Sequence, residues 1–138
     1  MKYLLDTNVL SEPLKAVPDQ LVLTRMEQYR GNVVTAILVV HELYYGCYRL
    51  LLSRKRTMIE RYINEIVLPS IPVLPYTEKA AEYHARERAR LQALGKSPAF
   101  VDGQIAAIAY TNNAILVTRN SADFENFSGL QIENWHSG

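Results

Sequence analysis

The chain has 138 residues, 49% of them hydrophobic and 21% charged, and a formal net charge of +1 at pH 7. The hydrophobic and charged fractions are typical of a globular protein and argue against a disordered chain. Because the net charge is close to zero, any nucleic-acid-binding surface would be a local basic patch. The single cysteine, Cys47, excludes an internal disulfide, and Asp6 interrupts the apolar start too early for a signal peptide. We therefore expect one cytoplasmic domain, residues 1–138, with no membrane segment.

The hydrophobic pattern predicts short strands that alternate with helices. Short apolar runs indicate strands, whereas apolar residues three and four apart indicate helices. In chain order, we expect a strand at 2–5, helices at 7–15 and 19–30, a strand at 33–35, helices at 36–52 and 54–68, a strand at 73–75, a helix at 77–94, a helix that opens at Asp102 and stops at Asn112, a strand at 114–117 and an edge strand at 130–133. Such an alternation is typical of an α/β fold with a short parallel sheet flanked by helices.

Acidic residues follow two of the predicted strands. Asp6 comes directly after the first strand, and Asp123 lies in the turn that follows the strand 114–117. Asp102 opens the helix before that strand. Since ligands of open α/β sheets bind beyond the carboxyl ends of the strands, we expect these acids to share one edge of the sheet. Each acid alone could equally serve as a helix cap or a turn residue.

A fourth acid, Glu42, lies in the most apolar predicted helix, 36–52. An unpaired carboxylate in such a place is costly or becomes protonated, so a compensating partner is expected. Arg49, seven residues further on, offers a salt bridge. A metal ion is the other candidate.

The four acids come without a matching set of histidines or cysteines, which is the ligand chemistry of Mg²⁺ or Mn²⁺. A metal would relieve their mutual repulsion, hold a phosphate and lower the pKa of a bound water for attack on phosphorus. Lys96 and Arg119 lie near the proposed cleft in the sequence and are the expected phosphate contacts.

Two other functions stay open. In a non-catalytic interaction module, the acids would be caps and ion pairs, and the tyrosine-rich helix 36–52 would bind a protein partner. In an aspartyl-phosphate phosphatase, Asp6 would be the nucleophile, although the residue two positions on is Asn8 rather than a second acid.

Four motifs carry a family resemblance: LLDTNVL at 4–10, HEL at 41–43, PxxxDxxIAAxA at 98–109 and TRNxxDF at 118–124. Together they resemble the PIN-domain ribonucleases, and more closely the VapC-type toxins of type II toxin–antitoxin pairs, including the FitB-like branch. The resemblance implies a three-layer α/β/α PIN fold and a Mg²⁺- or Mn²⁺-dependent endoribonuclease that acts as a toxin. It also implies a homodimer and a cognate antitoxin that blocks the cleft.

The resemblance assigns the candidate site residues one by one. Asp6, Glu42 and Asp102 match the metal-binding acids of the family, and Asp123 matches the fourth, which contacts the metal directly or through water. Thr118 and Asn120 match the polar residues that steady these acids, and Thr7 and Asn8 are candidates for further hydrogen-bond partners of the ligands. Because sequence-specific recognition of RNA favours unstacked bases, single-stranded loops of a structured RNA are the expected substrate.

Overall fold

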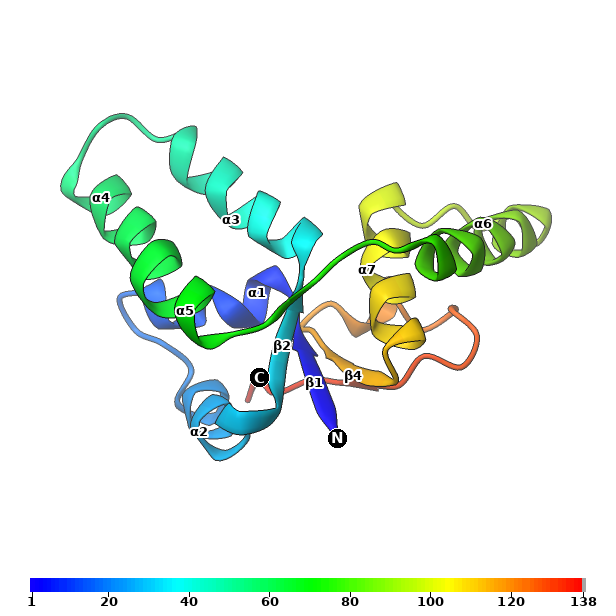
Figure 1. The fold of residues 1–138 in the computed structure, drawn as a ribbon, viewed down its shortest axis with the longest axis horizontal. Coiled ribbons are helices and arrows are strands. Elements are labelled where there is room, and N and C mark those ends of the chain that lie inside the picture. Colours follow the sequence, from blue (N-terminus) through cyan, green and yellow to red (C-terminus); the bar gives the residue numbers. More distant parts are fainter. Residues whose placement is uncertain (138) are drawn as a thin grey trace.

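The structure, a computed structural model, describes residues 1–137 and is built around a five-stranded parallel sheet (Figure 1). The strands are β1 (Lys2–Leu5), β2 (Val33–Ala36), β3 (Val73–Leu74), β4 (Ala114–Val117) and β5 (Ile132–Glu133). Their order is β3-β2-β1-β4-β5, so that β1 lies in the centre and pairs with both β2 and β4. Leu5 is opposite Val117 at the carboxyl end of this pair.

Helices cover both sides of the sheet, as the predicted three-layer α/β/α fold requires. Figure 1 shows α3, α4 and α5 on one side and α6 and α7 on the other. The helices are α1 (Thr7–Leu10), α2 (Gln20–Gln28), α3 (Ile37–Tyr48), α4 (Arg54–Arg61), α5 (Leu68–Ser70), α6 (Glu78–Ala93) and α7 (Phe100–Thr111). Short 3₁₀ turns are η1 (Glu12–Leu14), η2 (Arg30–Asn32) and η4 (Ser121–Asp123), and η3 (Tyr62–Val67) is a π-helical turn. None of the helices among residues 1–137 is long and apolar enough to cross a membrane.

Local sequence explains most helix ends. Asp19 and Thr77 cap α2 and α6 with their side chains, and Asn113 adopts a positive φ of 56° just after α7. The start of α7 differs from the prediction, because the helix begins at Phe100 and its N-cap is Ala99, without a side-chain cap. Asp102 therefore lies inside the first turn, where an acid is favoured by the helix dipole, and the interpretation of Asp102 as a cap is wrong.

The core confirms the parallel sheet and shows that the most apolar helix is open on one side. All residues of β2 and β4 are buried, as expected of strands covered on both faces. By contrast, α3 is not buried all round, since Tyr45 and Tyr48 are 61% and 51% exposed. Its apolar sequence thus combines a face that packs in the core with one that faces solvent.

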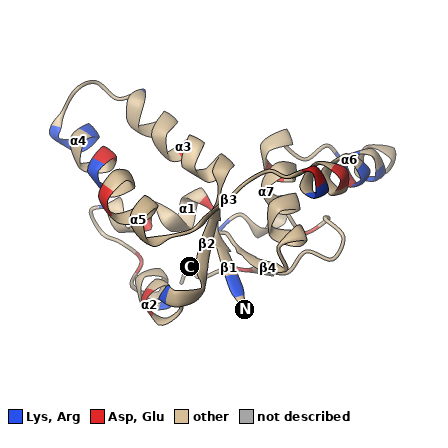
Figure 2. Ribbon diagram, viewed as in Figure 1, with Lys and Arg blue, Asp and Glu red and all other residues tan. Residues whose placement is uncertain are grey.

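Charged residues gather on two helices, α4 and α6. Figure 2 shows Lys and Arg on α4 and along α6. The first turn of α4 carries Arg54, Lys55 and Arg56 behind the N-cap Ser53, and has no acid. This arrangement opposes the helix dipole, which favours negative charge at the N-terminus, so helix stability does not account for it.

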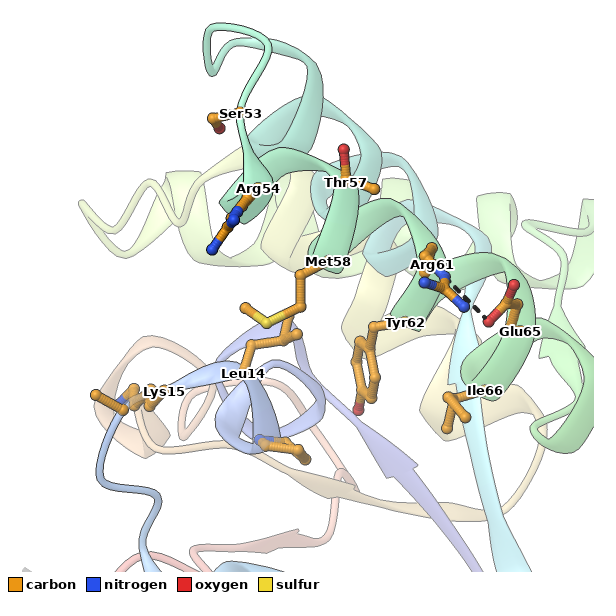
Figure 3. Close-up of a pocket in the computed structure, with 12 residues that line it drawn as sticks. Leu14, Lys15, Ser53, Arg54, Thr57, Met58, Arg61, Tyr62, Glu65 and Ile66 are labelled. Atoms are coloured by element: carbon orange, nitrogen blue, oxygen red, sulfur yellow. Dashed lines mark ion pairs between the residues drawn. The ribbon is translucent and has the colours of Figure 1, made fainter.

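A pocket of about 880 Å³ lies between η1 on one side and α4 and η3 on the other (Figure 3). Leu14, Met58, Tyr62 and Ile66 line it, and the hydroxyl of Tyr62 donates a hydrogen bond of 2.7 Å to the Leu10 carbonyl. None of the four acids predicted for the site lines this pocket.

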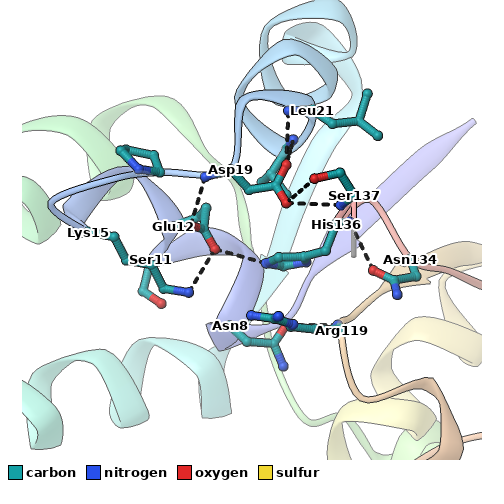
Figure 4. A network of polar contacts seen from close by, with 12 residues as sticks. Asn8, Ser11, Glu12, Lys15, Asp19, Leu21, Arg119, Asn134, His136 and Ser137 are labelled. Carbon is teal, nitrogen blue, oxygen red and sulfur yellow. Dashed lines mark hydrogen bonds and ion pairs between the residues drawn. The ribbon is translucent and has the colours of Figure 1, made fainter.

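The residues after β5 are tied to the segment between α1 and α2 (Figure 4). Glu12 is only 1% exposed, and its carboxylate accepts a hydrogen bond from the Asp19 backbone at 3.0 Å and lies 2.9 Å from His136 Nε2. Lys15 forms an ion pair with Glu12 at 3.1 Å. Burial raises the pKa of Glu12, but the hydrogen bonds from Asp19, Lys15 and His136 outweigh it and leave the pKa below its usual value.

Glu12→Ala is expected to lower the free energy of unfolding by about 3 kcal/mol, because it leaves the buried partners of this carboxylate unsatisfied. Glu27→Ala is the matched control, since Glu27 is exposed and its ion pair with Arg30 at 3.6 Å is worth little. Urea unfolding of both variants measures the difference. Equal losses in the two variants would contradict a special role for the buried network.

Candidate active site at the carboxyl ends of β1 and β4

Asp6 is fixed at the point where β1 ends. Its side chain accepts hydrogen bonds from the Thr7 backbone at 2.8 Å and from the Thr118 hydroxyl at 2.9 Å, one on each carboxylate oxygen. Its backbone N–H donates to the Val117 carbonyl at 2.9 Å. Asp6 is 7% exposed. The adjacent ends of two parallel strands thus hold one buried carboxylate in a single orientation.

The polar residues predicted around the acids form a connected network. The Thr118 hydroxyl, which donates to Asp6, accepts from the Asn120 backbone at 3.1 Å and from Asn8 Nδ2 at 3.4 Å. Asn8 Oδ1 in turn accepts from the Arg119 backbone at 3.0 Å (Figure 4). Asn120 takes part through its backbone, and its side chain is exposed.

Glu42 reaches the same network from α3. Its carboxylate accepts a hydrogen bond of 2.7 Å from the Thr7 hydroxyl, so Thr7 links Asp6 to Glu42. Glu42 is half-buried rather than enclosed, because one face of α3 is open. The salt bridge considered with Arg49 is absent from residues 1–137, and the Arg49 guanidinium lies 5.7 Å from the centre of the Tyr45 ring instead.

Asp102 and Asp123 complete the group electrostatically. Asp102 is half-buried in the first turn of α7, and burial followed by the charges of Asp6, Asp123 and Glu42 raises its pKa to about 6. Burial is also the main cause that raises the pKa of Asp6, with smaller contributions from Glu42 and Asp123. Asp123 itself is exposed at the end of η4. Asp6 and Asp102 are therefore each close enough to Glu42 and Asp123 to be affected by their negative charge.

The donor set fits a hard divalent cation. Among residues 1–137, no three histidine, cysteine or acidic side chains form a ready-made cage for an ion. Mg²⁺ does not need one, because it keeps several water molecules and binds through one or two carboxylates. In that part of the chain, none of the four acids forms an ion pair with Lys, Arg or His. Their negative charge is thus available to a cation.

A groove of about 580 Å³ extends from Glu42 along α3 and the start of α4. Thr7, Arg49 and Lys55 are among its lining residues. Lys55 was not predicted for the site, although a basic residue in the first turn of a helix was the available signal. Of the predicted phosphate contacts, Arg119 is exposed next to Thr118, whereas the Lys96 ammonium donates to Asn126 at 3.1 Å.

The chain is similar to known proteins over almost its whole length. The PIN domain family matches residues 3–130. The ribonuclease VapC2 of Haemophilus influenzae is 34% identical over 137 residues, 98% of each chain, and the toxin FitB of Neisseria gonorrhoeae is 31% identical over 136 residues, 96% of this chain and 98% of FitB. The crystal structure of VapBC2 from Rickettsia felis bound to a DNA fragment from their promoter matches with a TM-score of 0.84 at 28% identity, covering 98% of this chain and 99% of that one.

These likenesses, together with the sheet order and the carboxylates at its edge, define a class of protein. The chain belongs to the PIN-domain family, and within it to the VapC- and FitB-type ribonuclease toxins. The resemblance read from the four sequence motifs and the predicted α/β/α fold are both confirmed.

Asp102→Asn should stabilise the metal-free protein at neutral pH. A folded-state pKa of about 6, raised from 3.8, means that ionised Asp102 opposes folding, and that this cost grows as the pH rises from about 4 to 6. After allowance for solvent screening, the gain is about 1 kcal/mol, or about 3 °C in Tm at pH 7.5. Thermal unfolding in EDTA measures it. The difference should shrink towards zero near pH 4, and a lower Tm for Asp102→Asn at pH 7.5 would contradict the electrostatic account.

Proposed function

We propose that the chain is a divalent-metal-dependent endoribonuclease whose ion, Mg²⁺ or Mn²⁺, binds to Asp6, Glu42 and Asp102. Asp123 is the fourth acid and acts directly or through water. The observation that carries this proposal is the grouping of four acids from separate elements, none of which has a cationic partner among residues 1–137. Hydroxyl and N–H groups hold two of them, Asp6 and Glu42. Asp6 does cap α1 through the hydrogen bond from the Thr7 backbone, as the sequence allowed. Caps and ion pairs alone, the non-catalytic alternative, do not account for the grouping of all four acids.

The ion, when bound, would lower the pKa of a water molecule and offset negative charge on the phosphate. The chain's own residues prepare the place for it. Thr118 and the Thr7 backbone fix both oxygens of Asp6, and the Thr7 hydroxyl orients Glu42. Such neutral donors set the direction of each carboxylate without neutralising its charge, which is what the ligands of a catalytic metal need.

Basic side chains beside these acids could bind the RNA backbone. The groove beside Glu42 carries Arg49 and Lys55, and Arg119 is exposed at the end of β4. Basic side chains at these points would bind phosphates next to the site of cleavage, and the substrate would be a single-stranded loop of a structured RNA.

Protein partners are part of the proposal. The R. felis relative was solved as the VapBC2 complex, and FitB is named a toxin. We propose that this chain likewise assembles with a cognate antitoxin and forms a homodimer. Exposed apolar residues at the end of α3 and in the loop that follows, Tyr45, Tyr48, Leu51 and Leu52, offer a surface for such contacts.

The phosphatase alternative fits the geometry less well. In that class of enzyme a second acid stands two residues after the nucleophilic aspartate, whereas position 8 here is Asn. The residue two positions on, Asn8, is bound to Thr118 and to the Arg119 backbone. Neither observation favours a covalent phosphoryl intermediate on Asp6.

Asp102→Asn should abolish toxicity and RNA cleavage. In pulsed expression at matched soluble protein levels, the wild type is expected to arrest growth and Asp102→Asn to allow it, and cleavage of total RNA by the purified variant should fall by about 100-fold or more, because a metal site supplies several kcal/mol of stabilisation. Glu27→Gln, which changes an exposed acid on α2, is the control that should behave as wild type.

EDTA should stop the cleavage, and Mg²⁺ or Mn²⁺ should restore it. Full activity of Asp102→Asn, or of the wild type in EDTA, would disprove the metal-site assignment.

Lys55→Gln should weaken RNA binding without changing the chemical step. Loss of one phosphate contact is expected to raise KM about threefold, to leave kcat unchanged and to reduce the salt dependence of binding by about one ion. Lys79→Gln on α6 serves as the control for loss of a surface lysine. A fall in kcat for Lys55→Gln with KM unchanged would argue against a groove that only binds phosphates.

A further inference from the structure

A buried histidine lies behind the helix turn that carries Asp102. His84 on α6 is 4% exposed, and its Nδ1 lies 2.9 Å from the hydroxyl of Tyr76, in the segment between β3 and α6. Its ring centre is 4.7 Å from that of Phe100, with the two ring planes at 62°. Burial, followed by the charge of Arg88, lowers the pKa of His84, so the imidazole is neutral near pH 7 and contributes shape and a hydrogen bond rather than charge.

The contact with α7 is unusually close. A Cβ added at Gly103 would lie 2.3 Å from His84 Nε2 and 2.5 Å from its Cδ2, so the imidazole fills the space that any side chain at position 103 would need. The free space between these residues is only about 10 Å³, which is about the least that could hold a water molecule. The ring therefore packs directly against the backbone of α7.

His84 contacts the back of the first turn of α7. Residues three apart lie on the same helix face, so Phe100 and Gly103, which both contact the imidazole, share one face. Asp102 lies on another face, where burial and then the charges of Asp6, Asp123 and Glu42 raise its pKa. The acid and the imidazole are thus on different sides of the same turn.

This turn needs support from behind. It has no side-chain cap at Ala99, and the charges of the other acids repel Asp102. Repulsion would push the turn away from the ends of β1 and β4 unless something opposes the movement. The imidazole is in position to do so, because it is itself held by Tyr76.

We propose that His84, held by Tyr76, is a positioning residue that braces the first turn of α7 and so fixes Asp102 relative to the other acids. The inference rests on the proposed function, since it concerns the geometry of the metal site. If His84 and Tyr76 only packed in the core, neither would affect metal affinity. The proposal gives both residues such an effect, through the contact between α6 and α7.

Binding of Mn²⁺ alone tests the proposal without a known RNA. Free Mn²⁺ is measured by electron paramagnetic resonance at pH 7.5 with wild type, Asp102→Asn, His84→Ala and Tyr76→Phe, each shown to be folded by circular dichroism. Loss of a residue that orients a metal ligand is expected to weaken binding about tenfold for His84→Ala and about threefold for Tyr76→Phe. Asp102→Asn should weaken it at least as much as His84→Ala.

Tyr83→Phe is the matched control for Tyr76→Phe. The Tyr83 hydroxyl, like that of Tyr76, makes one hydrogen bond, which it donates to the Ser128 carbonyl at 2.8 Å, but its ring stacks on Tyr110 near the opposite end of α7. Its removal should lower Tm to a similar extent and leave Mn²⁺ affinity unchanged. If Tyr83→Phe weakened Mn²⁺ binding as much as Tyr76→Phe, loss of stability would explain both, and the positioning role would be overturned.

Gly103→Ala is a second test of the proposal. Unlike His84→Ala, it adds a methyl group and leaves no cavity in the core. In the wild-type background the new Cβ must displace either the imidazole or the turn, and either shift disturbs the contact between them, so Mn²⁺ binding should weaken. In the His84→Ala background the ring is gone, and the same substitution should cost little more, which is the non-additivity expected of residues in contact. Additive losses would count against direct bracing.

The outcomes separate the two proposals. If Asp102→Asn weakens Mn²⁺ binding while His84→Ala and Tyr76→Phe bind as tightly as wild type, the metal site stands and the positioning role fails. If the wild type binds no Mn²⁺, or Asp102→Asn binds it as well as wild type, the metal-dependent function fails and the positioning role fails with it. Should His84→Ala not fold, Tyr76→Phe with its matched control decides.

Discussion

The mutual repulsion of four carboxylates at one edge of the sheet is the constraint on which the rest of the structure depends. Asp6, Glu42, Asp102 and Asp123 come from four separate elements, and each is brought to this edge by the parallel pairing of β1 with its neighbours. Burial and like charge raise the pKa values of Asp6 and Asp102. A fold that keeps such groups together must hold each one by means other than an opposite charge.

The fold meets this requirement with neutral contacts. Hydroxyl groups of Thr7 and Thr118 orient Glu42 and Asp6, and Asn8 joins the ends of β1 and β4. Acids elsewhere in the molecule are treated differently. Glu12 and Glu87 are buried as well, but each has a basic partner, and the pKa of each lies below its usual value. The contrast between paired and unpaired acids marks the site more clearly than burial does.

Much of this arrangement could be predicted from the sequence, for physical reasons. Asp6 and Asp123 follow short apolar runs, and parallel strands bring their carboxyl ends to one edge, so the position of both acids follows from local pattern. The environment of Glu42 could not be predicted, because an apolar helix sequence does not tell which face is open. The start of α7 was misplaced by two residues, since Asp102 matches both a cap and a first-turn acid. The contact of His84 with Gly103 joins two helices and leaves no local signal in either.

The hydrogen bond between Asp6 and Thr118 joins residues 112 positions apart, and the contact between Glu12 and His136 spans 124. Contacts of such long range close large loops, and the entropy cost of closing them slows folding. During synthesis, Asp6 leaves the ribosome long before Thr118 exists. The nascent chain therefore carries Asp6 without its Thr118 partner until the segment that contains β4 has been made. Translation thus leaves the acids at this edge of the sheet unassembled until most of the chain has been synthesised.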